Sequence, residues 1–210
     1  MMTREQIPLV ESRLGKPRVI TLHAELNPYE MRLVSGSLRR QRTHDVTLFI
    51  LHEGRVAVIR KPQFAAGMYR APSGGVEPGE SFEDGARREA LEETGLTVCL
   101  ERYLIRVQAI FAPPAGWPID ALPAGLLEPD NGNIRWYTHI IAARVVGEPA
   151  LGPRDTREIA EARWMTLDEL QGPVRERLVA SGRALFAYRV ALTDATVALL
   201  RPERAKGVCT

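Results

Sequence analysis

One stretch of the chain, from Gly74 to Leu96, strongly limits what the sequence can form. Its glycine-rich start predicts a turn. Ser81 followed by Asp84 is a capping-box signature, which predicts a helix that begins just after Ser81. Gly95 stands where a C-terminal glycine cap belongs. The stretch therefore predicts a tight turn that leads into one short, capped helix.

Three acidic residues share one face of this predicted helix. Glu89, Glu92 and Glu93 stand at positions i, i+3 and i+4, which places their carboxylates within roughly 100° of arc. They fall on the side of Phe82 and Ala86 rather than on the opposite side, where a solvated face belongs. Clustered carboxylates repel one another, and a bound divalent cation removes that repulsion. Ligands that are all oxygen favour Mg²⁺ or Mn²⁺ over zinc.

The stretch also matches a longer pattern, G-x5-E-x7-R-E-U-x-E-E-x-G-U, in which U is an apolar residue. The matching residues are Gly74, Glu80, Arg88, Glu89, Ala90, Glu92, Glu93, Gly95 and Leu96. Seven fixed positions at roughly one in fifteen each make a chance match anywhere in a chain of this length about one in a million. The pattern resembles the signature of the Nudix hydrolases. Ala90 is a small residue for a U position, and Ser73 stands where these proteins commonly have a glycine.

This resemblance implies a fold, a reaction and a cofactor. Nudix enzymes use Mg²⁺ or Mn²⁺ to hydrolyse a nucleoside diphosphate linked to another moiety. The implied fold is α/β, of the α+β kind: an α/β/α sandwich with a mixed β-sheet, over roughly residues 45–172. The chemistry is consistent, because metal ions neutralise charge on phosphate oxygens and lower the pKa of an attacking water. A nearby carboxylate can then complete the deprotonation of that water.

The resemblance also implies roles for the residues of the pattern. Glu92 and Glu93 correspond to the main metal ligands, and Glu80 corresponds to an additional ligand, often acting through water. Glu89 corresponds to a ligand or to the catalytic base. Arg88 corresponds to the arginine that holds one of these glutamates in place. An ordinary surface ion pair is the alternative for Arg88.

Four further candidates lie outside the pattern. In several Nudix subfamilies a glutamate from a later loop reaches the metals as the base. Glu158 is the first candidate for that role and Glu161 the second, with a surface position as the alternative for each. Arg70 is a candidate for binding a substrate phosphate, although a surface role is the stronger alternative. Trp117, in the Pro- and Gly-rich segment 112–133, either stacks on a base or anchors its loop to the core.

Periodicity and turn residues predict the elements around this stretch. Residues 1–43 are expected to form an N-terminal extension, 44–172 the Nudix domain, and 173–210 a helical segment packed on that domain. Within these parts we expect strands at 18–26, 97–111 and 134–146, a hairpin at 46–52 and 55–61, and helices at 28–38 and within 173–200. Segment 112–133 is expected to form a wall or lid of the pocket.

Composition sets the general class of the protein. The length of 210 residues, with 45% hydrophobic and 26% charged residues, fits one globular domain with extensions. Cys99 and Cys209 have no motif partner, which favours a reducing compartment. No segment has the roughly 18 apolar residues that span a membrane, and the N-terminus lacks an apolar signal core, so a cytoplasmic location is expected.

Charge gives little reason to expect a nucleic acid partner. The formal net charge is only +2. Arginines cluster in two places, where solvated surface is the main interpretation and contact with substrate phosphates the alternative. The clustered residues are Arg39, Arg40, Arg42, Arg154, Arg157 and Arg163.

The substrate is less constrained than the reaction. A small-molecule nucleotide is expected. Sugar nucleotides of the ADP-ribose type are slightly favoured by the N-terminal arm together with the basic residue and proline after the hairpin, Lys61-Pro62. Nucleoside triphosphates and dinucleoside polyphosphates stay open. Residues 60–72 do not match the arginine-rich motif of the coenzyme A members, and the downstream motif of the NADH members is missing.

Two other kinds of function and a homodimer are alternatives that the sequence leaves open. A non-catalytic Nudix nucleotide sensor is the alternative of another class, but such proteins usually lose the carboxylates that are all kept here. An RNA-directed pyrophosphohydrolase would need a continuous basic groove, whereas these arginines are scattered. The arm 1–43 could cover the sheet or exchange with a partner subunit in a homodimer.

Overall fold

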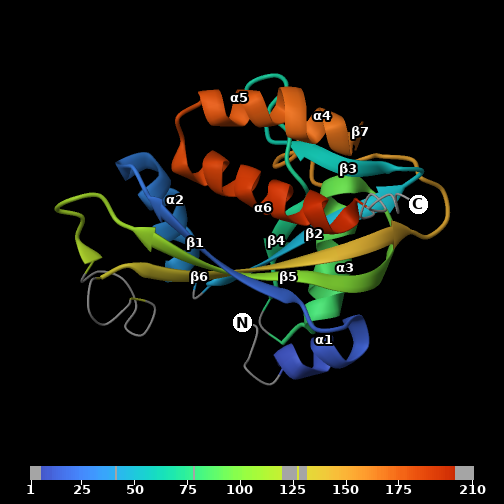
Figure 1. Cartoon of the computed structure of the whole chain (residues 1–210), viewed down its shortest axis with the longest axis horizontal. Helices are drawn as coiled ribbons and strands as arrows, with labels where there is room; N and C mark the ends of the chain where they lie inside the picture. The colour runs from blue at the N-terminus through green and yellow to red at the C-terminus, as the bar shows by residue number, and fades with distance from the viewer. Residues whose placement is uncertain (1–5, 41, 78, 120–126, 128–131, 202–210) are drawn as a thin grey trace, which may run out of the picture.

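The computed structural model describes residues 6–40, 42–77, 79–119, 127 and 132–201 (Figure 1). The strands are β1 (Arg18–Glu25), β2 (His44–His52), β3 (Arg55–Arg60), β4 (Ser73–Gly75), β5 (Val98–Ala112), β6 (Ile134–Val145) and β7 (Glu161–Thr166). The helices are α1 (Gln6–Leu14), α2 (Pro28–Arg39), α3 (Phe82–Thr94), α4 (Leu167–Glu169), the π-helical turn η2 (Leu170–Val174), α5 (Arg175–Ala180) and α6 (Ala184–Leu200).

A single mixed sheet forms the middle layer. Its order is β1-β5-β6-β2-β3-β7, and β4 pairs with β2 off this path. Strand β1 runs parallel to β5 and β2 runs parallel to β6, whereas the other pairs are antiparallel. The predicted mixed sheet is therefore confirmed. Part of the expected N-terminal extension, residues 18–25, provides one of its strands.

Helices cover both faces of the sheet. One core contains Met31 of α2 and Leu192 of α6, together with residues of α5. The other contains Val10 of α1 and both Phe82 and Ala90 of α3. Figure 1 shows α5 and α6 on one side of the strands and α1 and α3 on the other. This arrangement confirms the α/β/α sandwich that the resemblance implied.

Local signals explain where several elements begin and turn. Helix α2 begins with Asn27 as its cap, in a capping box with Glu30, and with Pro28 in the first turn. Between β2 and β3 the backbone takes positive φ at Glu53 (47°) and Gly54 (74°), as a tight hairpin turn requires. The predicted helix and hairpin are thus both present.

Two features differ from the expectation. Helix α1 was not predicted; it packs Val10 into the core, and its Glu11 accepts from Arg106 at 3.1 Å. The C-terminal helical segment is divided into α5 and α6 near Gly182, whose φ of 66° interrupts a helix. No helix in the described part of the chain is long and apolar enough to cross a bilayer.

Candidate active site

The stretch that the sequence singled out forms β4, a turn and α3. The side chain of Ser81 accepts a hydrogen bond from the backbone N–H of Asp84 at 3.1 Å, which caps the helix at its start. Gly95 ends the helix in the left-handed conformation, at φ 79°. Both predicted ends of the helix are confirmed, and α3 lies against the sheet with its acidic residues beside β4.

Arg88 lies among three of the four pattern glutamates. Its Nε donates to Glu80 at 3.0 Å, and its Nη1 donates to Glu89 and to Glu92 at 3.0 Å each. Its Nη2 donates to the carbonyl oxygen of Gly75 at 2.8 Å. Hydrogen bonds to Glu80 raise the pKa of Arg88 above its usual value. Burial opposes ionisation of Glu80, but the hydrogen bonds from Arg88 hold the pKa of Glu80 below its usual value.

The fourth glutamate, Glu93, is held separately in the interior. Only 5% of Glu93 is exposed, and its carboxylate accepts from the backbone N–H of Ser73 at 2.6 Å and from Nη2 of Arg70 at 3.3 Å. Nη1 of Arg70 donates to the hydroxyl of Ser73 at 2.7 Å and to the carbonyl oxygen of Ala71 at 2.9 Å. Arg70 therefore orients Glu93, and its predicted contact with a substrate phosphate stays a prediction.

Glu89 lies between these two groups, against Gly74. A Cβ atom on Gly74 would lie 1.8 Å from the carboxyl carbon of Glu89, so only glycine leaves room for this carboxylate. Burial, followed by the charge of Glu93, raises the pKa of Glu89 to about 7.

These residues fit a hard divalent cation by their chemistry. All four carboxylates are oxygen donors, and Glu89 is buried close to the charge of Glu93. Within the described ranges, no three acidic, histidine or cysteine side chains converge in the geometry of an assembled ion site. Arg88 stands between three of the carboxylates instead, so a cation has to compete with Arg88 for Glu89 and Glu92.

A cavity of about 370 Å³ opens beside β4 and extends between α2 and α6. Its lining combines basic, acidic and aromatic side chains. The charged lining residues are Arg40, Arg42, Asp45, Lys61, Arg70, Glu158 and Arg189. The aromatic lining residues are Phe64, Phe111, Trp136, Phe186 and Tyr188. Arg40 and Arg42 thus have a more specific place than the solvated surface expected for their cluster.

The two candidates for the base are separated by the structure. Glu158 lines the cavity, with 63% of its side chain exposed, and accepts from Nζ of Lys61 at 2.7 Å. Glu161 lies on β7, outside the lining, where it accepts from the hydroxyl of Tyr69 at 2.8 Å and from Arg60 at 3.4 Å. The position of Glu158 agrees with its predicted role, which stays a prediction.

Trp117 lies away from the cavity lining. It packs against the core on the α2 and α6 side of the sheet, in agreement with the anchoring alternative. Its stacking on a base stays a prediction, as does the lid role of segment 112–133, of which 120–126 and 128–131 lie outside the described residues. Phe111, at the end of β5, does line the cavity.

Sequence reasoning missed Asp45, Trp136 and Arg189 as lining residues. Arg189 follows Tyr188 in an apolar helix, and no motif marks either residue. The charge of Arg189 amid apolar neighbours was the one available signal. Asp45 stands in a strand of buried residues, where an acid that is 7% exposed needs a charged partner.

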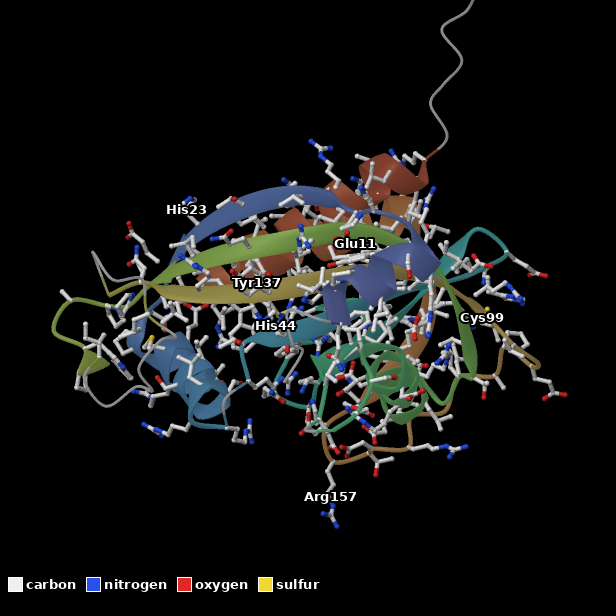
Figure 2. The ribbon with its side chains drawn as sticks, turned by 90° about the horizontal axis from the view of Figure 1, so that it is seen from below. Glu11, His23, His44, Cys99, Tyr137 and Arg157 are labelled. Atoms are coloured by element: carbon white, nitrogen blue, oxygen red, sulfur yellow. The ribbon has the colours of Figure 1, made fainter. Side chains whose placement is uncertain are left out.

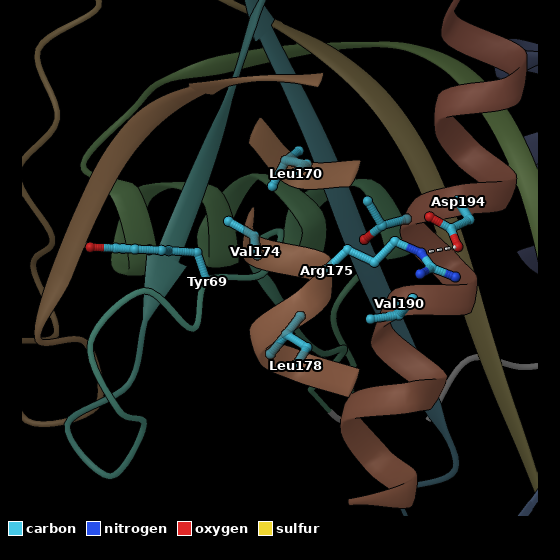
Figure 3. A pocket seen from close by; sticks show the side chains of 8 residues that line it. Tyr69, Leu170, Val174, Arg175, Leu178, Val190 and Asp194 are labelled. Atoms are coloured by element: carbon cyan, nitrogen blue, oxygen red, sulfur yellow. Dashed lines mark hydrogen bonds and ion pairs between the residues drawn. The ribbon is translucent and has the colours of Figure 1, made fainter. Parts of the chain in front are cut away.

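A second, much smaller cavity of about 10 Å³ lies between η2, α5 and α6 (Figure 3). Arg175 donates to Asp194 across its edge at 3.0 Å. This space is about the size of one water molecule, so it is not a substrate site.

The comparison with known proteins agrees with the geometry. The family model described as a NUDIX domain matches residues 41–188. The chain therefore belongs to the Nudix family. Enzymes of this family generally use divalent metal ions.

Among curated proteins, the chain is similar to the NAD-capped RNA hydrolase NudC of Chromobacterium violaceum, at 32% identity over 138 residues. It is also similar to NudC of Mycobacterium tuberculosis, at 32% identity over 146 residues. These matches cover 65% and 66% of this chain but only 43% and 37% of the relatives, so the chain spans about two fifths of their length.

Among solved structures, the solution structure of the E. coli ORF135 protein matches with a TM-score of 0.46 and 20% identity, over 77% of this chain and 93% of that protein. A crystal structure titled UDP-X diphosphatase matches with a TM-score of 0.43 and 18% identity, over 68% of this chain and 61% of that one.

Proposed function

We propose that this enzyme uses Mg²⁺ or Mn²⁺ to hydrolyse the pyrophosphate bond of a nucleoside diphosphate linked to another moiety. One observation carries the proposal: Arg70 and Ser73, which hold Glu93 of α3, also line a cavity of about 370 Å³ that has both cationic and aromatic side chains in its wall. Cations suit a diphosphate, and aromatic faces suit a base. A sugar nucleotide of the ADP-ribose type is the favoured substrate.

A dinucleotide is the second candidate substrate. The curated relatives are named as hydrolases of NAD-capped RNA, and NAD is itself a nucleoside diphosphate linked to a second moiety. The missing downstream motif of the NADH members counts against it. Nucleoside triphosphates and dinucleoside polyphosphates complete the set of substrates to be compared.

The residues of the site have different proposed roles. Glu80, Glu89, Glu92 and Glu93 would hold the cation, which would neutralise phosphate charge and lower the pKa of an attacking water. Arg88 orients Glu80, to which it donates from both Nε and Nη2. Arg70 and the backbone N–H of Ser73 fix Glu93.

We propose Glu158 as the base that takes the proton of the attacking water. Glu158→Gln should slow hydrolysis by about 10²-fold or more, because a general base typically contributes that much. Glu161→Gln is the matched control, since Glu161 lies outside the cavity lining. Near-normal rates for Glu158→Gln would move the role to Glu89, or to Glu161 if hydrolysis is slow in the Glu161→Gln variant instead.

A hydrolysis screen tests the proposal as a whole. The purified enzyme is incubated with ADP-ribose, NAD, ATP, diadenosine tetraphosphate and coenzyme A, each with Mg²⁺, with Mn²⁺ and with EDTA. We expect metal-dependent release of AMP, fastest from ADP-ribose. Tight nucleotide binding with no turnover under any of these conditions would instead favour the non-catalytic sensor.

A further inference from the structure

Five charged side chains form a series beside the cavity: Glu93, Arg70, Arg189, Asp45 and Arg42. The series begins at Glu93 and Arg70, whose Oε1 and Nη2 atoms are 3.3 Å apart. Arg189 lies next to Arg70 and is 3.9 Å from Asp45, which in turn is 2.7 Å from Arg42. Three guanidinium groups thus have only two carboxylates within ion-pair distance, while Glu89 and Glu158 act on Arg42 from farther away.

Arg189 has weak partners for a charged group in a mostly buried position. Only 22% of its side chain is exposed. Its Nη1 donates to the hydroxyl of Thr47 at a long 3.4 Å, and its nearest carboxylate oxygen is 3.9 Å away. Burial and the neighbouring charge of Arg70 lower the pKa of Arg189. A buried guanidinium with so little compensation is stabilised by an anion.

Arg42 lies at the other end of this series of charged side chains, against Gly75 of β4. Its Nε and Nη2 both donate to Oδ1 of Asp45, at 3.0 and 2.7 Å. A Cβ atom on Gly75 would lie 2.2 Å from Nε, so glycine at this position leaves the space that Arg42 occupies. Nη1 of Arg42 makes no hydrogen bond to any described residue, and this donor is therefore available to a ligand.

We propose that Arg42 and Arg189, bridged by Asp45, form an anion site that holds a phosphoryl group of the diphosphate. The assignment deepens the proposed function and rests on it for the identity of the substrate. Both arginines line the cavity, whose basic lining residues outnumber the acidic ones by five to two. The aromatic lining residues then take the organic part of the ligand. Asp45 and Gly75 act as positioning residues for Arg42.

Binding of ADP in EDTA tests the site without any metal or turnover. Isothermal titration calorimetry compares the wild type with Arg42→Gln, Arg189→Gln and Arg39→Gln. Arg39 is the matched control, because it is exposed on α2 and outside the lining while its loss changes the net charge equally. We expect the first two variants to weaken ADP binding by about tenfold or more, as for a lost charge-assisted bond, and the control by less than about twofold.

Adenosine as a second ligand and a Gly75→Ala variant provide two further controls. Adenosine has no phosphate, so its affinity should be equal in all four proteins. Gly75→Ala should weaken ADP binding in the wild type but not in an Arg42→Gln background, because its effect acts through Arg42. If Arg189→Gln does not fold, Arg42→Gln and this double-mutant cycle still test whether the anion site exists.

The outcomes separate this inference from the proposed function. An enzyme that hydrolyses ADP-ribose but binds ADP equally well in the Arg42→Gln and Arg39→Gln variants overturns the anion site alone. A wild type that does not bind ADP overturns it as well. A protein that binds ADP through both arginines but hydrolyses nothing keeps the anion site and loses the enzymatic proposal.

Discussion

Glu93 is a buried carboxylate that contacts Ser73 and Arg70 and that we propose as a metal ligand. Glu93→Gln keeps an oxygen for the Ser73 N–H but removes the charge opposite Arg70. We expect turnover to fall by more than about 10²-fold, because a metal ligand carries several kcal/mol of transition-state stabilisation. The free energy of unfolding should fall by only about 1–3 kcal/mol. Steady-state assays and urea titrations measure both, and retained turnover would refute the assignment of Glu93 as a ligand.

Gly74 is predicted to matter for activity more than for stability. In Gly74→Ala the new methyl group would displace the carboxylate of Glu89, which is the flexible end of a side chain. We expect the chain to fold, with turnover reduced by about 10²-fold or more because Glu89 leaves the acidic cluster. Near-UV circular dichroism confirms the fold, and the Mg²⁺-dependent rate measures the loss. Unchanged turnover would contradict a role for Glu89 beside Gly74.

At the residue scale, the sequence identified the acidic cluster, named Arg42 and Arg70 of the basic one, and missed Arg189 and Asp45. Glu89 and Glu92 lie beside Arg88 because helical spacing is a local property that the sequence carries directly, and Glu80 reaches Arg88 from the turn just before the helix. Asp45 and Arg189 meet only because β2 and α6 pack together, and nothing in either segment encodes that contact. Local periodicity therefore predicted the acidic part of the site but not the contact between Asp45 and Arg189.

At the scale of elements, α2 offers a test of how a wall of the cavity is stabilised. Gly36 lies inside this helix, and a Cβ atom added there meets no atom within 4 Å. Gly36→Ala should raise the free energy of unfolding by roughly 0.5–1 kcal/mol, the helix propensity difference between the two residues. Turnover should not change, because Gly36 is outside the lining. A thermal melt that shows destabilisation by Gly36→Ala would contradict this expectation.

The elements that were predicted well carry their own end signals. Asn27-Pro28 begins α2, Glu53-Gly54 turns the hairpin, and Ser81 begins α3. Helix α1 lacks such signals in its described residues and has a single fully buried side chain, Val10. Its position depends on contacts with α3 and β5 that are distant in sequence, which explains why it was missed.

At the scale of the whole molecule, the order of strands could not be read from the sequence. The parallel pair of β1 and β5 joins residues such as Arg18 and Ile105, which are far apart along the chain. Alternation indicates that a segment is a strand, but not which neighbour it takes. The resemblance supplied the sandwich, whereas the place of β1 at the sheet edge required the structure.

Three strands also join in a buried polar chain on the α1 and α3 side of the sheet. The hydroxyl of Tyr103 can donate to Nδ1 of His139 at 2.5 Å, and Nε2 of His139 to Nδ1 of His44 at 3.0 Å. His44 stacks on Tyr137 with ring centres 4.8 Å apart, and both are visible in Figure 2. Burial lowers the pKa of His44 to about 4 and that of His139 well below its usual value. Asp45 opposes the shift of His44, whereas Arg106 adds to that of His139.

These two histidines should make the whole fold sensitive to acid. Each has a folded-state pKa below its unfolded value of about 6.5, so the unfolded chain binds more protons below that pH. The two histidines should thus lower the free energy of unfolding between pH 6.5 and pH 4, by about 1.4 kcal/mol per unit each. Glu89, whose pKa is raised to about 7, acts in the opposite direction between pH 7 and its unfolded value, so it offsets about one histidine's share there. Urea titrations from pH 8 to pH 4 measure this slope. His44→Phe, which keeps a ring on Tyr137, should flatten the slope, whereas His23→Gln on the exposed side of β1 should not; equal slopes in both would show that carboxylates alone cause the loss.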